Sequence, residues 1–154
     1  MLDGTAVYAA VIGGTLAALA ACALLQYEWL VLVWRWLSVH GGHRRVKVFY
    51  SIVSVSLLHI VQIWIFGAMT FALLLWPACG SIAGPPSVGF LDCLYLSAVS
   101  FSTVGFGDVA PVGAIRFLVA TEALSGLMLI AWSASFTYIE MERFWRAEDM
   151  TGHE

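Results

Sequence analysis

The chain has 154 residues, 61% of them hydrophobic, and its mean hydropathy is +0.89. Soluble domains average about 45–50% apolar residues, so this excess predicts a single membrane domain rather than a soluble protein. The formal net charge of −3 argues against a nucleic-acid partner.

Three apolar segments are long enough to cross a bilayer, for which about 20 residues suffice. They occupy approximately residues 6–37, 48–76 and 115–138, and Gln26, Tyr27 and Glu28 interrupt the first of them. The first is longer than one crossing requires, so we expect it to be tilted or to end along the inner interface. The sequence therefore predicts an all-α membrane protein with three transmembrane helices.

The segment between the second and third helices, residues 77–111, is too polar and too broken to be a fourth span. Within it, residues 90–101 read as a short apolar helix of about 12 residues, which favours a re-entrant segment. Cys79 and Cys93 would lie on the same side of the membrane. They could form a disulfide there, or remain free as small hydrophobic residues.

Basic residues predict the orientation of the chain in an inner membrane, because cytoplasmic loops carry an excess of lysine and arginine. Those near the first loop and after the last span are Arg35, Arg44, Arg45, Lys47, Arg143 and Arg146. We therefore expect the C-terminus in the cytoplasm, and the N-terminus and residues 77–111 outside. No predicted span carries arginine at every third position, so the sequence indicates no voltage sensor.

Two histidines, His40 and His43, lie in the predicted cytoplasmic loop. They could bind a metal ion or respond to pH. The simpler alternative is a solvated loop beside Arg44 and Arg45.

The residues that close the short helix carry the clearest motif. Residues 103–108, Thr-Val-Gly-Phe-Gly-Asp, resemble the potassium-channel signature Thr-Val-Gly-Tyr-Gly-Asp, with phenylalanine in place of tyrosine. A span and a short helix precede these six positions and another span follows, which makes the match specific. A weaker resemblance to a bacterial branch of small ion channels covers about residues 57–138.

This resemblance implies a homotetrameric potassium channel in a lipid membrane. Residues 48–138 would form the pore domain, with outer helix, pore helix, filter and inner helix. Residues 1–47 would supply the first helix and cytoplasmic loop, and residues 139–154 a short cytoplasmic tail. We expect no cofactor, only potassium ions in transit. Assembly with other channel subunits stays open, as does a non-conducting regulatory role or a non-selective cation channel.

Filter chemistry explains the residue types of the motif. An ion entering a narrow pore loses its water, which rings of backbone carbonyls from four subunits can replace. Successive carbonyls point inward when the backbone alternates in hand, and glycine reaches positive φ without a Cβ penalty. We therefore expect K+ sites at Thr103, Val104, Gly105 and Phe106, bounded by Gly107. The Thr103 hydroxyl would be the innermost ligand, while the Val104 and Phe106 side chains turn away.

The aspartate that ends the motif, Asp108, has a candidate partner on the short helix. In related channels an aromatic donor near this position bonds the aspartate, so we predict a hydrogen bond from the Tyr95 hydroxyl to Asp108. Alternatively, Tyr95 merely meets the outer interface.

Glu122 stands inside the third span, where an ionisable residue is costly and usually functional. It lies about 10 Å below the start of that helix, at the depth that Gln62 reaches about 20 Å from the cytoplasmic side. We predict a polar cluster that braces the filter, with Gln62 or His59 or with the short helix near Ser100 and Ser102. Alternatively, Glu122 is protonated and bonded to one backbone carbonyl, or it faces the cavity in a cation-attracting ring.

The remaining candidates lie further along the third span. Gly126 stands where potassium channels often bend their inner helix, although a small residue also suits close helix packing. Trp132, Ser133, Ser135 and Phe136 could line the cavity or gate, with Ser133 or Ser135 as its polar wall. Their alternative role is helix–helix contact.

A competing interpretation is an intramembrane aspartyl protease, since Gly105 to Asp108 also read Gly-x-Gly-Asp. Such an enzyme needs a second aspartate within the membrane. The other aspartates, Asp3, Asp92 and Asp149, lie outside the predicted spans. We therefore expect no enzymatic activity.

Overall fold

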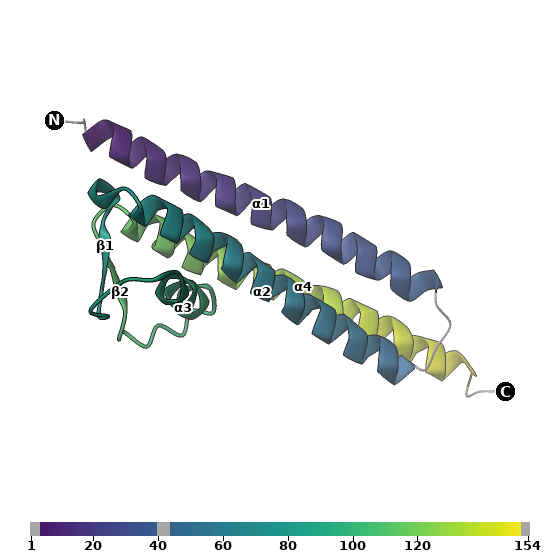
Figure 1. The fold of residues 1–154 in the computed structure, drawn as a ribbon. Helices are drawn as coiled ribbons and strands as arrows, with labels where there is room; N and C mark the ends of the chain where they lie inside the picture. Colours follow the sequence, from purple (N-terminus) through teal and green to yellow (C-terminus); the bar gives the residue numbers. More distant parts are fainter. Residues whose placement is uncertain (1–3, 40–43, 152–154) are drawn as a thin grey trace.

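The structure is a computed structural model that describes residues 4–39 and 44–151. The candidate metal or pH site at His40 and His43 lies outside the described residues. Three long helices dominate: α1 (Gly4–Val39), α2 (Arg44–Leu74) and α4 (Arg116–Thr151) (Figure 1). Between α2 and α4 come a short 3-10 turn (Pro77–Cys79), strand β1 (Ser81–Ala83), helix α3 (Phe90–Phe101) and strand β2 (Ala110–Val112).

Three helices are long and apolar enough to cross a membrane, as the sequence predicts: Gly4–Val39, Arg45–Leu74 and Arg116–Arg143. The four prolines of the chain all lie in residues 77–111, so none removes a backbone donor from these helices. Helix α4 continues to Thr151, so the predicted tail at residues 139–154 begins inside this helix.

Helix α3 has the bounds that its apolar run predicts, residues 90–101. At its start, the Asp92 carboxylate accepts a hydrogen bond of 2.7 Å from the Gly89 backbone N–H. A carboxylate is favourable there, because it satisfies a free donor and faces the positive end of the helix dipole. At 12 residues, α3 is about 18 Å long and too short to cross a bilayer core of about 30 Å.

Helix α1 packs along α2 and α4, on the side opposite α3 (Figure 1). Its buried residues recur every three or four positions, which places them on one helical face. They are Val7, Val11, Thr15, Ala18, Cys22, Gln26, Leu30, Val33 and Leu37. The opposite face of α1 is exposed and largely apolar, with Leu16, Leu24 and Leu32 each more than half exposed. This pattern suits a helix that meets protein on one side and lipid on the other.

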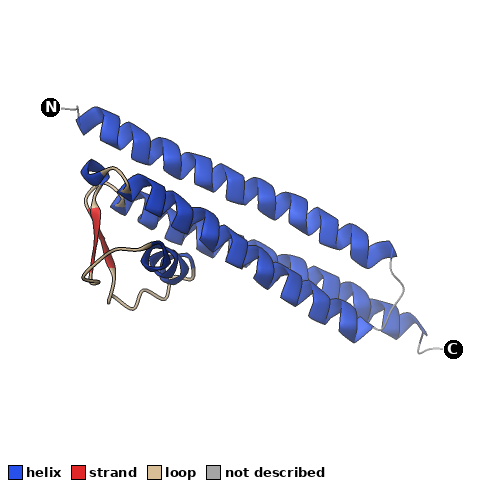
Figure 2. Ribbon diagram, viewed as in Figure 1, coloured by secondary structure: helices blue, strands red, loops and turns tan. Residues whose placement is uncertain are grey.

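Strands β1 and β2 form a two-stranded antiparallel sheet in which Ile82 lies opposite Pro111 (Figure 2). The all-α prediction did not include this sheet, because three-residue strands show no readable alternation. Just before β1, the backbone of Gly80 lies so close to β2 that a Cβ atom there would be 2.1 Å from the Val112 carbonyl oxygen. Gly80 has a φ of 137°, which favours glycine.

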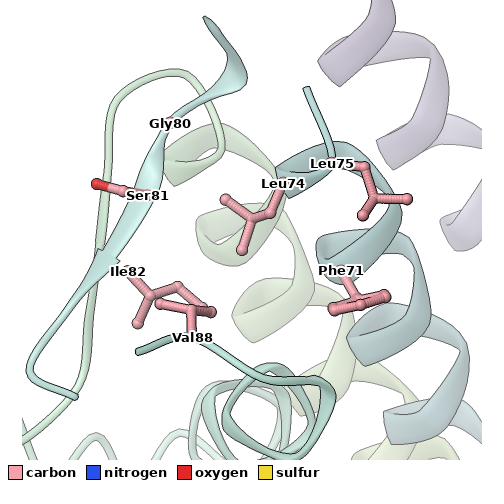
Figure 3. Close-up of a pocket in the computed structure, with 7 residues that line it drawn as sticks. All are labelled: Phe71, Leu74, Leu75, Gly80, Ser81, Ile82 and Val88. Carbon is pink, nitrogen blue, oxygen red and sulfur yellow. The ribbon is translucent and has the colours of Figure 1, made fainter. Parts of the chain in front are cut away.

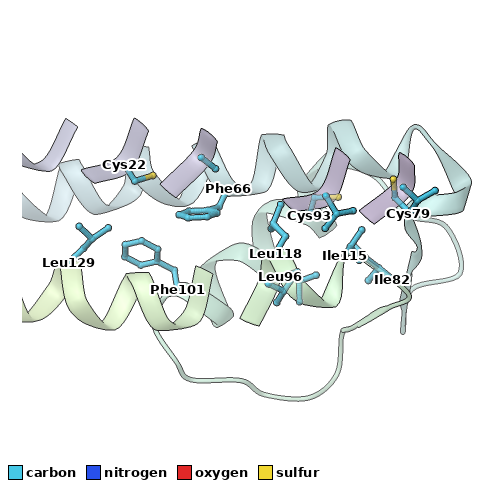
Figure 4. Packing of buried hydrophobic residues seen from close by; sticks show 14 residues of the cluster. Cys22, Phe66, Cys79, Ile82, Cys93, Leu96, Phe101, Ile115, Leu118 and Leu129 are labelled. Carbon is cyan, nitrogen blue, oxygen red and sulfur yellow. The ribbon is translucent and has the colours of Figure 1, made fainter. Parts of the chain in front are cut away.

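The buried core joins all four helices and the sheet, with Phe66, Phe101 and Leu118 among its largest members (Figure 4). Cys22, Cys79 and Cys93 are all buried and free. Cys79 and Cys93 therefore form no disulfide, and their alternative as small hydrophobic residues is the one observed. Burial raises the pKa of the Cys79 thiol.

Candidate functional site

The motif segment leaves the C-terminal end of α3 and turns back sharply. The Thr103 N–H donates to the Ser100 carbonyl at 2.9 Å, and the Gly105 N–H donates to the Val99 carbonyl at 3.1 Å. From Thr103 to Asp108 every residue is exposed in the single chain. The Phe106 side chain is 71% exposed, which is unusual for a large apolar group unless lipid or another chain covers it.

The backbone of this segment alternates in hand. Thr103, Gly105 and Gly107 have φ values of 58°, 53° and 80°, whereas Val104 and Phe106 between them do not have positive φ. Such alternation can direct successive carbonyl oxygens to one side of the chain. The positive φ expected at Gly105 and Gly107 is confirmed.

Thr103 is the one non-glycine residue with positive φ in the described part of the chain. A β-branched residue rarely adopts this conformation, and holding it there costs on the order of 1–3 kcal/mol. The glycine spacing of the motif did not reveal this third left-handed position. The surrounding contacts must therefore stabilise the segment, and three sets of contacts do so.

The first set holds the outer end of the segment. The Tyr95 hydroxyl donates to Asp108 Oδ2 at 2.8 Å, so the predicted hydrogen bond is present. This bond and the negative charge of Asp108 raise the pKa of Tyr95. The loop after β1 lies against the same residue, since a Cβ atom at Gly84 would lie 2.4 Å from the Asp108 carbonyl oxygen.

The second set clamps α3 between α2 and α4. At Gly67 of α2, a Cβ atom would lie 2.6 Å from Leu94 Cδ2 and 3.1 Å from Leu94 Cα. At Gly126 of α4, a Cβ atom would lie 2.3 Å from the Phe101 carbonyl oxygen. Both glycines thus admit α3 at close range. For Gly126 this geometry supports the close-packing alternative, and α4 runs through it as one continuous helix.

The third set lies between these two glycine contacts and centres on Ser97 of α3. The Ser97 hydroxyl lies 2.8 Å from the Ile63 carbonyl oxygen of α2 and is also hydrogen-bonded to Glu122 Oε1 of α4. Glu122 is completely buried. Its second oxygen, Oε2, has no hydrogen-bond partner among the described residues. We call Ile63, Gly67, Ser97, Glu122 and Gly126 the α3 junction.

The polar partners of Glu122 predicted from sequence need correction. Glu122 bonds the short helix at Ser97, one turn before Ser100 and not at Ser102, whose hydroxyl donates to the Ala98 carbonyl. Gln62 and His59 bond each other instead, with His59 Nδ1 at 2.8 Å from Gln62 Oε1. Equal depth along the membrane normal misled the prediction, because it does not say which way each helix face points.

Gln62 belongs to a second buried cluster, which links α1 to α2 and α4. Its Nε2 donates to Gln26 Oε1 at 2.9 Å and to the Cys22 carbonyl at 3.3 Å. Gln26 Nε2 in turn donates to Ser133 Oγ at 2.7 Å. We call Gln26, Gln62, His59 and Ser133 the glutamine network. Sequence reasoning treated Gln26 only as an interruption of the first apolar run.

This network bears on the two predicted cavity serines. Ser133 is 3% exposed and bonded to α1, which favours its helix-contact alternative over the cavity wall. Ser135 is exposed, and its hydroxyl donates to the Ala131 carbonyl of its own helix at 3.0 Å. Ser135 therefore keeps a free face on which it can border an aqueous space.

Two hollows lie near the ends of the loop region. One, of about 210 Å³, lies between the end of α2 and β1 and is lined by Phe71, Leu74, Leu75, Gly80, Ser81, Ile82 and Val88 (Figure 3). It is mainly apolar and contains none of the predicted site residues. A larger one, of about 560 Å³, borders the motif itself. Its lining includes Ser100, Thr103, Gly105, Pro111 and Ala123.

Comparisons with curated proteins give matches to part of this chain. Protein LctB of Geobacillus stearothermophilus is 37% identical over 67 residues, which cover 44% of this chain and 50% of that protein. The inward rectifier potassium channel Kirbac3.1 of Paramagnetospirillum magnetotacticum is 34% identical over 68 residues, which cover 43% of this chain and 23% of that protein. The chain thus spans half or less of these relatives. No solved structure matches it.

A protein-family model described as an ion channel matches residues 46–143. This match covers α2, the loop region with α3 and the motif, and most of α4. It leaves out α1. Because the match covers more than half of the chain, the chain belongs to the ion channel family.

Proposed function

We propose that this protein is a potassium-selective channel in which residues Thr103 to Gly107 of four chains bind a row of dehydrated K+ ions. The observation that carries this proposal is the alternating backbone, with positive φ at Thr103, Gly105 and Gly107. Rings of backbone carbonyls can replace the hydration shell of potassium. The name of the relative Kirbac3.1 includes potassium channel, which supports this choice of ion.

In this proposal α3 is a re-entrant pore helix. It is too short to cross the membrane, and its last residues lead directly into the motif. The C-terminal end of a helix carries partial negative charge, which favours a cation at this position. Irregular backbone at membrane depth is tolerated where it lines a pore. The N-terminus and residues 77–111 face outward across an inner membrane, and α4 ends in the cytoplasm.

A homotetramer accounts for the exposed surface around the motif. Val104 and Phe106 are 54% and 71% exposed in one chain, and the hollow of about 560 Å³ beside Thr103 and Gly105 is open. A neighbouring copy would cover both. Ser135 would line the cavity below the filter, while Asp108, Tyr95 and Glu122 would support the filter and Gly126 would seat α3.

Potassium flux into liposomes tests this proposal. The purified chain, reconstituted with a potassium gradient, is expected to pass K+ in preference to Na+ and to be blocked by barium. Gly105→Ala is expected to abolish this flux, because alanine strains a backbone with φ of 53°. The new methyl group itself meets open space in the single chain, so the fold of the single chain should survive.

Gly13→Ala is the matched control. Gly13 lies in α1 without positive φ, and its added Cβ would also meet nothing within 4 Å. It should leave flux unchanged. Full flux in Gly105→Ala would count against the filter assignment. A tetramer without any flux in the unmodified chain would point to a non-conducting subunit.

A further inference from the structure

The Ser97 hydroxyl stands between two oxygen acceptors. It lies 2.8 Å from the Ile63 carbonyl oxygen on one side and is hydrogen-bonded to Glu122 Oε1 on the other. A serine hydroxyl has one hydrogen to donate. It can therefore make only one of these two contacts as the donor.

Hydrogen-bond counting then assigns the missing proton. The Ile63 carbonyl has no hydrogen, so that contact needs the Ser97 proton. The contact to Glu122 is a hydrogen bond only if the carboxyl group donates to Ser97 Oγ. If Glu122 were a carboxylate, two unprotonated oxygens would face each other at one of the two contacts. A protonated Glu122 satisfies both contacts, and its Oε2 then becomes the carbonyl oxygen of a neutral acid.

The surroundings of Glu122 agree with a neutral group. The carboxyl group is fully buried and Oε2 has no partner in the described part of the chain. The ion pair between Arg143 and Glu140 lies more than four helical turns away from Glu122 along α4. A buried charge without a partner is far more costly than a buried neutral acid.

We propose that Glu122 carries a proton and starts a directed chain of two hydrogen bonds, from Glu122 to Ser97 and from Ser97 to the Ile63 carbonyl. These two hydrogen bonds run from α4 through α3 to α2. They lie between the two glycine contacts at Gly67 and Gly126, about one turn before the end of α3. The inference deepens the proposed function, because it makes Glu122 a positioning residue that acts on the filter through the pore helix.

Substitutions at Glu122 separate a proton donor from a charge. In Glu122→Gln, the amide N–H can donate to Ser97 and the amide oxygen replaces Oε2, so potassium flux should stay within about twofold of the unmodified chain. In Glu122→Met, a side chain of similar length lacks any donor. Flux or tetramer survival on heating should fall about tenfold, as expected for one lost buried hydrogen bond, while the Ser97 hydroxyl keeps its bond to the Ile63 carbonyl.

Infrared spectroscopy reads the proton directly and does not depend on flux. The difference spectrum between the unmodified protein and Glu122→Gln should contain the C=O stretch of a protonated carboxyl group, shifted in D2O. Ser97→Ala should move this band to higher frequency, because the carboxyl group loses its acceptor. Glu140→Gln is the matched control. Since Glu140 is paired with Arg143 at 3.0 Å, its substitution should remove carboxylate bands instead.

Two results would overturn the inference. One is a loss of carboxylate bands in Glu122→Gln without any band of a protonated carboxyl group. The other is a fall in flux or tetramer survival in Glu122→Gln as large as that in Glu122→Met. The spectra are measured on the purified chain, whatever it conducts. If that chain passes no potassium but shows the protonated band, the proposed function fails and the assignment of the proton stands.

Discussion

The glutamine network and the α3 junction are both buried polar regions, yet they are built differently. In the glutamine network, Gln26 and Gln62 each use their amide oxygen and their amide nitrogen in hydrogen bonds. In the junction, Glu122 is bound through one oxygen, and its other oxygen has no partner among the described residues. The first region holds α1 against α2 and α4, and the second holds α3 between α2 and α4.

The two regions therefore have different roles: the glutamine network attaches a helix, whereas the junction depends on the protonation of an acid. Amides carry no charge at any pH, so a hydrogen-bonded amide pair joins helices in the same way at every pH. Such bonds are expected between membrane helices, because lipid removes the hydrophobic driving force for their association. A carboxyl group with one unpaired oxygen depends on its proton to remain neutral. The chain therefore uses amides to hold α1 and a buried acid, Glu122, to hold α3.

The two regions approach each other at His59. Because Gln62 Nε2 donates to Cys22 and Gln26, Gln62 presents its Oε1 to His59. His59 Nδ1 must then carry a hydrogen. The His59 ring also lies 5.8 Å from the Phe101 ring at the end of α3. A single residue, His59, therefore connects the network that holds α1 to helix α3.

The largest effect is expected from breaking the junction at its backbone contact. Gly126→Leu places a side chain where a Cβ atom alone would lie 2.3 Å from the Phe101 carbonyl oxygen. Overpacking of this kind costs about 1–3 kcal/mol or more, and here it displaces the helix that leads into the motif. Tetramer yield and melting temperature in detergent should both fall. An unchanged melting temperature would show that α3 does not approach α4 this closely.

A smaller effect is expected in the glutamine network. Gln26→Leu removes one hydrogen bond from Gln62 and one from Ser133. A buried hydrogen bond between membrane helices contributes about 0.6 kcal/mol on average and up to about 1.7. The melting temperature should fall, while selectivity for K+ over Na+ should stay the same. Altered selectivity would contradict these separate roles of the two regions.

A double substitution sharpens this test. Removing both partners of a buried bond is less harmful than the two single losses together, because neither amide of the pair is left buried without the other. Gln26→Leu combined with Gln62→Leu should therefore destabilise the chain by less than the sum of the two single variants. Strict additivity would mean that the two amides are not coupled.

The smallest effect is expected from the exposed hydrogen bond between Tyr95 and Asp108. Its loss gives an exposed reference with which the losses in the two buried regions can be compared. Tyr95→Phe should speed the decay of potassium current slightly. Since this bond raises the pKa of Tyr95, its contribution is fully present below the ordinary pKa of a tyrosine. It is lost as the pH rises through the higher value, where two negative groups meet. Currents at strongly alkaline pH should then resemble those of Tyr95→Phe.

Much of this architecture is readable from sequence. Hydropathy predicts three spans, the apolar run predicts α3 at residues 90–101, and the glycine spacing predicts left-handed positions at Gly105 and Gly107. These features depend on local composition and on single-residue backbone preferences. The hydrogen bond between Tyr95 and Asp108 was within reach because related channels carry an aromatic donor at this position.

The remaining features depend on how helices rotate about their own axes. Hydropathy places Glu122 and Gln62 at one depth but does not show that Glu122 faces α3 and Gln62 faces α1. Gln26 looked like a break in an apolar run because its partners are 36 and 107 positions away in sequence. The left-handed Thr103 escaped prediction because its conformation opposes its own residue preference.

The β1–β2 sheet has a consequence for ligand affinity. It joins Ala83 to Ala110, so the residues between them, including the motif, form a loop whose ends are held together before any ion arrives. The entropy of closing such a loop, which grows with (3/2)RT ln n, is lost during folding. If the motif binds ions as proposed, an ion that enters meets coordinating groups that are already ordered. The free energy of its binding is not diminished by the ordering of the loop.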